Sequence, residues 1–245
     1  MAIELDKNRA FSAAHFALEL GGELNGIIKS IEGGGVKVDV MTYQQGGMYD
    51  RWRQIGKPKF EDLKMQIGMS TSAPYYMWIK QFFEGTQDRR DGAVVAADFY
   101  YKERARREFK FGLIRELTIP GLDATGKDAL YMTIAISVES IDYKPGLDGA
   151  QIDHKAKDYQ NTRLWKANDF RFNLAGFDTS KVNKVDAITI KQNIVEYHYG
   201  GARAPTKSPS QMDFPNISFT LPESAAASLV ARFNERGAAI KHAKL

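Results

Sequence analysis

The 245-residue chain contains no cysteine. This absence excludes disulfide bonds, thiolate metal ligands and cysteine nucleophiles, and it fits assembly in the cytoplasm. The chain also lacks an uninterrupted apolar run long enough to cross a bilayer. Its first seven residues, MAIELDK, are too polar for a signal peptide, so we expect no export by the general secretory pathway.

Catalytic and cofactor motifs are lacking as well. The four histidines, His15, His154, His198 and His242, form neither an HxH nor an HExxH pair. There is no GxSxG elbow and no Walker A loop. The glycine-rich residues 32–37 (EGGGVK) precede a strand pattern rather than a phosphate-holding helix N-terminus, and they predict a β-turn. We therefore expect a non-enzymatic protein with no catalytic residue, no metal and no cofactor.

Positively charged residues are only slightly more numerous than negatively charged ones. Lysine and arginine number 34 against 30 aspartates and glutamates, a formal net charge of +4. This balance allows contact with anionic partners without requiring it. Opposite charges are interleaved along most of the chain, which favours an ordinary solvated surface. Apolar residues make up 43%, enough to build buried cores.

Period-two alternation of apolar and polar residues is the main pattern present. It occurs in residues 15–20, 36–40, 63–67, 109–113 and 130–138. Such alternation is typical of strands with one buried and one solvent-facing side. Short strands joined by turns that contain glycine and proline favour a mainly β fold, either a barrel or a sandwich.

One helix is predicted within the first half. Residues 70–73 offer capping groups, Pro74 suits the first turn, and Gly85 stands just past the end. The apolar residues between these limits follow helical spacing: Tyr75, Trp78, Ile79 and Phe82. An aromatic stripe of this kind could bind a ligand, but packing against a sheet is the commoner role and is what we expect.

Landmarks of the first half recur in the second half in the same order. Residues 16–20, 36–38, 46–47, 65–67 and 85 have counterparts at residues 170–174, 188–190, 200–201, 217–219 and 237. A second helix pattern begins at Pro222, with an apolar face of Ala226, Leu229, Val230 and Phe233. The near-constant spacing predicts a duplication: a complete β-barrel domain at residues 1–145 and a shorter repeat at residues 146–245.

The predicted repeat has a consequence for assembly. Residues 143–151 carry Pro145, Gly146 and Gly149 and are interpreted as a linker. The second copy ends soon after Gly237, so it lacks the last strands of the first copy. A truncated barrel exposes an open edge, and open edges pair with other chains. The sequence therefore predicts that the protein functions as an assembly.

The first half also resembles a known family. Its motifs run in the order HFALEL, VKVDV, a long loop after Gly46-Gly47, FEDLKMQIG, the Trp-bearing helix YYMWIKQFFEG, a hairpin, and the closing strand ALYMTIAISVESIDY, which contains Glu139. Over residues 11–143 this order is similar to that of the tail-tube proteins of contractile phages and related contractile injection systems. A usual tube subunit has a single domain, so the second copy is a departure from the family.

The resemblance implies two tandem tail-tube-like domains, each with a flanking helix, and a structural role in a virion tail or injection-system particle. It implies a hexameric ring, or a ring of three subunits with six domains, stacked around a lumen that passes DNA or effector protein. Expected partners are further copies of the chain and sheath, baseplate or tape-measure proteins, with no membrane. The alternatives are a baseplate-proximal initiator or adaptor ring, and a soluble β-barrel module that binds nucleic acid.

Two segments are candidates for contacts between subunits. In residues 46–59 (GGMYDRWRQIGKPK), Tyr49 and Trp52 are candidate buried anchors, and Arg51 and Arg53 are candidate partners of acidic residues. The competing interpretation is that Trp52 folds back onto its own domain.

The second candidate is the densest basic segment, which contains Lys102, Arg104, Arg106, Arg107 and Lys110. We expect it at a hairpin tip, where a solvated turn is the first interpretation. A rim that contacts the next ring or a sheath is the second. Single-stranded nucleic acid, bound by these cations and the nearby aromatic residues, is the third.

Overall fold

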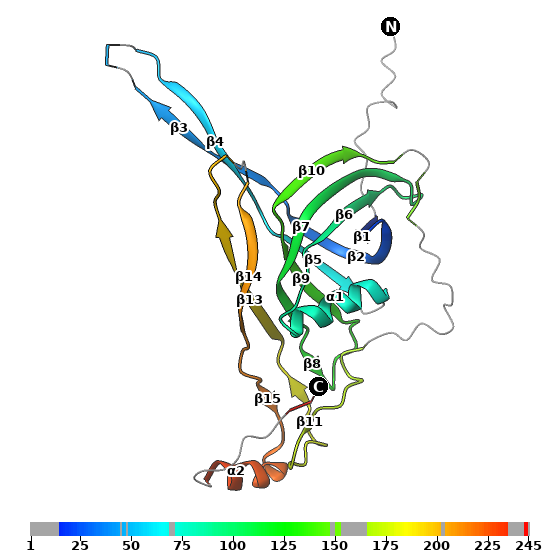
Figure 1. Ribbon diagram of the computed structural model, residues 1–245. Helices are drawn as coiled ribbons and strands as arrows, with labels where there is room; N and C mark the ends of the chain where they lie inside the picture. The colour runs from blue at the N-terminus through cyan, green and yellow to red at the C-terminus, as the bar shows by residue number, and fades with distance from the viewer. Residues whose placement is uncertain are drawn as a thin grey trace.

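The computed structural model describes residues 15–44, 46–47, 49–68, 72–147, 150–152, 166–201, 204–234 and 243–244. The chain is mostly β, with a helix packed on a barrel, as the sequence predicts. Figure 1 shows the barrel near the centre, a long hairpin projecting from one end, and residues 219–234 at the opposite end.

Six strands pair antiparallel in a closed cycle. In order around the barrel they are β1 (His15–Leu20), β2 (Glu23–Gly33), β5 (Leu63–Gly68), β9 (Tyr131–Ser137), β7 (Glu103–Ile119) and β6 (Arg90–Ala97), which returns to β1. Closure satisfies the backbone groups that a flat sheet would leave at its edges. β10 (Ser140–Pro145) follows β9 and pairs with the first part of β7.

The core fills the inside of this barrel. Every barrel strand, together with β10 and the helix, contributes apolar side chains, among them Leu18, Ile28, Met65, Val94, Ile114, Ile134, Ile141 and Trp78. The predicted alternation is confirmed at residues 63–67, where Leu63, Met65 and Ile67 are buried and Lys64 is exposed. Burial of such a cluster is the main favourable term in folding.

The alternation predicted for residues 109–113 is wrong at its centre. Phe109 and Leu113 are buried, but Phe111 is 46% exposed and has a positive φ of 54°. A regular strand cannot hold this backbone conformation, so the side-chain phase of β7 changes there. Downstream, Ile114 and Leu117 enter the core.

The predicted helix is confirmed as α1 (Ala73–Phe83). The Ser72 side chain accepts a hydrogen bond from the Tyr75 N–H, Pro74 lies in the first turn, and Gly85 has a φ of +69° just after the end. The buried residues are the predicted stripe: Tyr75, Trp78, Ile79 and Phe82. The Trp78 indole N–H donates to the Asp88 carbonyl at 3.2 Å, so this stripe is a packing face.

The projecting hairpin consists of β3 (Val36–Tyr43) and β4 (Trp52–Phe60), and we call it the arm. Two predictions are wrong here. All eight residues of β3 are exposed, so this strand has no buried side. Residues 52–60 form a strand rather than part of a long loop. The alternation of valines therefore marks a strand that leaves the barrel, because local pattern does not report which surface a strand meets.

The second half extends the barrel sheet. β13 (Ile188–Tyr197) pairs with the last residues of β7, and β14 (Thr206–Asp213) pairs with β13. Ile188 and Ile190 join the barrel core. The remaining described elements are short: β8 (Leu122–Asp123), β11 (Asn173–Leu174), β12 (Lys184–Val185), β15 (Phe219–Thr220), η2 (Glu223–Ala225), α2 (Ala227–Asn234) and β16 (Ala243–Lys244).

The division into domains at residues 145 and 146 stays a prediction. The linker predicted at residues 143–151 is wrong at its start, since β10 runs to Pro145. Ile152 then packs with Ala17, Val95 and Ala97 on the outside of the barrel. Of the sequence landmarks, Ser70, His154, Gly237 and His242 lie outside the described residues.

Candidate assembly surfaces

The arm joins the barrel at a glycine-rich root. The sequence predicts a β-turn at this position. Gly33 still pairs with Leu63 in the barrel sheet, and Gly34 has a φ of +75°. A Cβ at Gly33 would lie 2.0 Å from the Asp62 carbonyl oxygen, so only glycine fits. The Tyr143 hydroxyl donates to the Gly34 carbonyl at 2.7 Å. The root is therefore a close crossing that directs the arm out of the barrel.

One face of the arm is apolar. The cross-strand pairs Val36–Phe60, Val38–Pro58 and Val40–Ile55 follow one another along it. Residues directly opposite each other in an antiparallel pair share a face. Val36, Val40 and Ile55 are 46%, 58% and 74% exposed. A two-stranded hairpin with an apolar face in water is marginally stable by itself, so this face is suited to a partner surface.

Charged side chains lie along the same hairpin. Lys37 Nζ lies 2.6 Å from Glu61 Oε1, and Lys59 Nζ lies 3.2 Å from Asp39 Oδ2. The hydrogen bond from Lys37 holds the pKa of the Glu61 carboxyl below its ordinary value. Both pairs are largely exposed, and exposed pairs contribute little to stability. They increase the solubility of the arm.

The candidate anchor residues gather at the far end of the arm. Trp52 pairs with Tyr43 across the hairpin and remains 66% exposed, and Tyr49 is fully exposed. Arg51 and Arg53, on either side of Trp52, are exposed too. Trp52 is therefore not buried against its own barrel, and the tip offers two aromatic rings flanked by two guanidinium groups.

The prediction that the basic segment lies at a hairpin tip holds for Lys102 alone and is wrong for the rest of the segment. The turn between β6 and β7 occupies residues 98–102, and Arg104, Arg106 and Arg107 lie within β7. Arg104 forms an ion pair with Asp98 at 2.8 Å, and the Arg107 guanidinium lies 5.5 Å from the centre of the Tyr143 ring. Arg104 and Arg107 therefore have partners within the chain.

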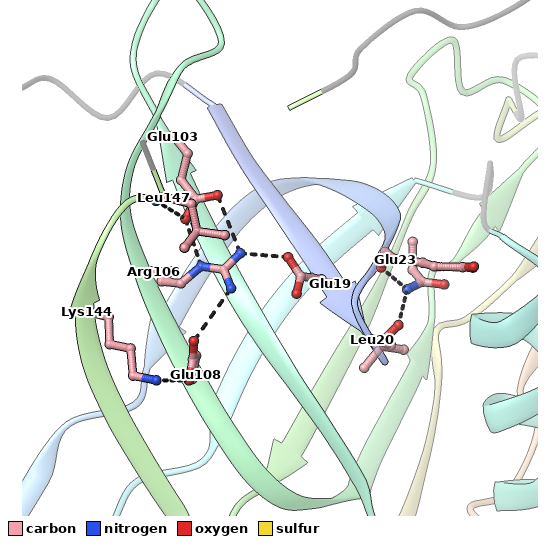
Figure 2. A network of polar contacts seen from close by, with 9 residues as sticks. Glu19, Leu20, Glu23, Glu103, Arg106, Glu108, Lys144 and Leu147 are labelled. Atoms are coloured by element: carbon pink, nitrogen blue, oxygen red, sulfur yellow. Dashed lines mark hydrogen bonds and ion pairs between the residues drawn. The ribbon is translucent and has the colours of Figure 1, made fainter. Parts of the chain in front are cut away.

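Arg106 is the centre of a buried charge network, shown in Figure 2. Its guanidinium nitrogens lie 2.7 Å from Glu103, 2.8 Å from Glu19 and 3.5 Å from Glu108. Lys144 Nζ lies 2.5 Å from Glu108 and extends the network to β10. Only 9% of the Arg106 side chain is exposed. Three strands, β1, β7 and β10, are thus joined by two cations and three carboxylates.

The network raises the pKa of Arg106 and lowers the pKa of Glu108. The hydrogen bond to Glu103 is the main effect that raises the pKa of Arg106, and burial opposes it. The hydrogen bond from Lys144 is the main effect that lowers the pKa of Glu108. Charge-assisted hydrogen bonds favour the ionised form of both groups. The Arg106 guanidinium, surrounded by carboxylates, has little charge left to offer a partner.

Asp98 closes the β6–β7 turn and gives a testable pH dependence. Burial raises its pKa, but hydrogen bonds from Arg104 and the N–H groups of Lys102 and Tyr100 outweigh burial and lower the pKa overall. A lowered pKa contributes stability above the unfolded value of about 3.9 and loses it as the pH falls through the folded value. Urea unfolding of Asp98→Asn should show a deficit at pH 7 that shrinks below about pH 4. A deficit that is constant with pH would contradict this.

Sequence reasoning missed the contacts that fix the β13–β14 hairpin to the barrel. The Gln87 side-chain amide donates to the Ile114 carbonyl at 2.9 Å and accepts from the Ile114 N–H at 3.0 Å. It also donates to the Gln192 side chain, which donates in turn to the Ser210 carbonyl. One part of β7 pairs with β6 and a later part pairs with β13. Between these two parts, the side chain of Gln87 makes the hydrogen bonds to β7 that a neighbouring strand would otherwise make.

A second set of contacts satisfies the backbone hydrogen-bonding groups of Lys207 on the outer edge of β14. The Lys207 N–H donates to the Glu139 carboxylate at 2.7 Å, and the Lys207 carbonyl accepts from Arg89 at 2.6 Å. The Lys207 ammonium is buried and donates to the Ser137 hydroxyl at 2.9 Å. An acidic and a basic side chain thus act together as a strand partner. No local pattern could reveal this, since the residues are far apart in sequence.

Neither a metal-binding cluster nor a membrane-spanning helix occurs in the described part of the chain. No cluster of three or more His, Asp or Glu side chains there could hold a metal ion. Within the same residues, no helix has the length and apolar character needed to span a membrane.

Comparisons with known proteins extend this picture. A family model described as "T4-like virus tail tube protein gp19" matches residues 12–142, which is more than half of the chain. Residues 143–245 lie outside that match. No curated protein matches the sequence.

Several solved structures match part of the chain. A chain of the extracellular contractile injection system PVC sheath–tube complex is 14% identical, with a TM-score of 0.50 over 59% of this chain and 99% of that chain. The anti-feeding prophage tube terminating cap is 17% identical, with a TM-score of 0.49 over 59% and 99%. Hcp1 from Flavobacterium johnsoniae is 13% identical, with a TM-score of 0.34 over 57% and 98%.

Proposed function

The chain belongs to the T4-like virus tail tube protein gp19 family, and from that premise we propose that its copies form rings that stack into a tube. The tube conducts DNA or an effector protein through its lumen, within a virion tail or an injection-system particle assembled in the cytoplasm. The protein is structural and has no enzymatic role. Six subunits per ring are favoured over three, since the described residues contain one closed barrel.

The observation that carries this proposal is the arm. A hairpin that projects from a closed barrel with exposed Val40, Ile55 and Trp52 leaves apolar surface in water. Burial of such surface contributes about 25 cal/mol per Å². Within one subunit this stabilisation is not obtained, so the arm supports contact with a neighbouring copy in the same or the adjacent ring.

Further partners follow from the same role. Sheath and baseplate proteins would contact the outside and the end of the tube, and a tape-measure protein its lumen. A baseplate-proximal initiator or adaptor ring is the second candidate function. The β13–β14 hairpin favours it, because this hairpin lies beyond the residues that match the family model and adds a surface specific to this chain.

A soluble module that binds nucleic acid receives less support. The basic segment of β7 would have to supply the phosphate contacts. Its central residue, Arg106, is buried among Glu19, Glu103 and Glu108. A buried and neutralised guanidinium cannot reach a phosphate backbone without first breaking these pairs.

The aromatic tip gives the test. The double variant Tyr49→Ala/Trp52→Ala should fail to form tubes in negative-stain microscopy, since central aromatic anchors contribute most of the free energy at such interfaces. Its thermal midpoint as a dissociated subunit should match wild type, because both side chains are exposed. Phe99→Ala, which removes an exposed aromatic ring at the β6–β7 turn, is the matched control. Tubes of normal yield from the double variant would contradict the proposal.

A further inference from the structure

A deep apolar groove lies beside α1, away from the arm. Its volume is about 490 Å³, within the range of clefts that hold large apolar groups. One wall comes from α1 and the other from the junction between β7, β8 and β13. The lining includes Tyr76, Phe83, Leu122, Met132, Phe170 and Ile188.

Charged residues are also part of the groove lining. Asp169, Arg171 and Asp186 line it, and all three are exposed. Asp186 also lies 3.6 Å from Lys184, but both side chains of that pair are more than half exposed, so the pair is weak. The groove therefore combines a mostly apolar lining with two carboxylates and one guanidinium.

We propose that this groove receives the arm tip of a second copy of the chain, with the Trp52 indole inside it and Arg51 and Arg53 beside Asp169 and Asp186. This inference rests on the proposed function and names the docking site of the arm. Trp52 is 66% exposed on its own subunit, and both neighbouring arginines are exposed. The guanidinium of Arg171 can stack on the indole face.

The positions of the arm tip and the groove allow the same tip-to-groove contact to repeat from one copy of the chain to the next. The arm tip lies at one end of the molecule, and α1 and β8, which line the groove, lie toward the other end (Figure 1). A contact between unlike surfaces of identical subunits is head-to-tail, and it generates a ring or an open filament rather than a closed dimer. The eight residues of β3 extend about 26 Å, so the tip lies far from the root of the arm.

The second half of the chain is required for this site. Phe170 and Ile188 come from residues beyond the family match, and Leu122 pairs with Val185 of β12. Residues 169–171 and 185–188 supply six of the residues that line the groove. The groove is therefore a docking site that this chain builds with its own additional segment.

Photo-crosslinking tests the contact directly. Full-length protein with p-benzoylphenylalanine in place of Trp52 is assembled into tubes and irradiated, and the crosslinked peptides are identified by mass spectrometry. We expect adducts between the probe and residues 117–122, 169–171 or 185–188 of another copy. The same probe in place of Tyr199, an exposed residue near the end of β13, is the matched control and should not label the groove.

The outcomes separate the two proposals. Tubes that form and carry Trp52 adducts only outside the groove overturn this inference and leave the proposed function intact. Groove adducts from the Tyr199 probe, with none from the Trp52 probe, overturn it as well, because the occupant would be the β13–β14 hairpin. Wild-type protein that forms no tube or ring at high concentration overturns the proposed function itself.

A charge exchange provides an independent test. Arg51→Glu/Arg53→Glu should raise the critical concentration for assembly at least about tenfold, a shift equivalent to the loss of one good contact. Asp169→Lys/Asp186→Lys should do the same. The chain that carries all four substitutions should recover most of the loss, since the opposite charges meet again across the interface. Additive losses in the fourfold variant would contradict the docking geometry.

Discussion

Replacing Arg106 with methionine is expected to lower the free energy of unfolding of the subunit by about 3–5 kcal/mol at pH 7. The guanidinium is almost fully buried and contacts Glu19, Glu103 and Glu108. Methionine removes the cation and leaves the carboxylates of Glu19 on β1 and of Glu103 and Glu108 on β7 without it. An uncompensated buried charge is far more destabilising than the loss of one exposed pair.

The pH dependence gives this prediction a distinctive signature. The raised pKa of Arg106 means that its contribution in the wild type is present at every pH below its unfolded value. In Arg106→Met the carboxylates repel one another only while they are ionised. The deficit relative to wild type should therefore shrink as the pH falls toward about 4, where glutamates become protonated.

Urea unfolding of the dissociated subunit provides the measurement. Arg115→Met is the matched control, because Arg115 forms an ion pair with Asp62 at 2.7 Å but is 56% exposed. Its loss should change stability by no more than about 1 kcal/mol. An Arg106 variant that unfolds at the same urea concentration as the Arg115 variant would show that the network is not a structural element.

The contrast between α1 and the arm shows what local pattern determines. For α1, the cap at Ser72, the proline and the following glycine all act within one or two turns, and the apolar stripe meets the barrel as predicted. For β3, the same kind of alternation gives a strand whose residues are all exposed. Local sequence determines the backbone conformation of a segment. The surface that the segment meets depends on residues distant in the chain.

Arg106 illustrates the same limit for the candidate site. In sequence it belongs to a run of cations typical of a solvated or phosphate-binding surface. Glu19, one of its partners, is 87 residues away and adjacent only because β1 and β7 both pair with β6. The tip of the arm was predictable, since Tyr49, Arg51, Trp52 and Arg53 are contiguous. The groove was not, because its lining comes from five separate segments of the sequence.

Some edges of the sheet are paired within the subunit, and other surfaces are left for a neighbouring copy. The prediction that open edges require neighbouring copies has to be narrowed, because β13 pairs with the last part of β7 within the subunit. Gln87 satisfies Ile114 between the two paired stretches, and Arg89 with Glu139 satisfies Lys207 on β14. Backbone pairing is thus completed internally at these positions. The surface left for a neighbour is the apolar face and aromatic tip of the arm.

Replacing Gln87 with methionine is expected to lower the free energy of unfolding by about 2–4 kcal/mol, because a buried N–H and a buried carbonyl of Ile114 both lose their partner. Hydrogen exchange should report the site. The Ile114 amide should exchange much faster in the variant, and the amides of β13 should follow as that hairpin loosens. Gln81→Met, which removes a more exposed amide on α1, is the control and should leave both unchanged.

A double substitution tests whether Gln87 and Gln192 act together through their hydrogen bond or only fill space separately. In Gln87→Met/Gln192→Met both buried amides are replaced by apolar side chains, so the Gln192 amide is no longer left without Gln87. The loss in the double variant should be smaller than the sum of the two single losses, by an interaction energy of about 0.5–3 kcal/mol. Strict additivity would mean that the two glutamines act separately. In that case β13 would be held to the barrel by its pairing with β7 alone, and the side chain of Gln87 would have no part in joining the additional segment to the family fold.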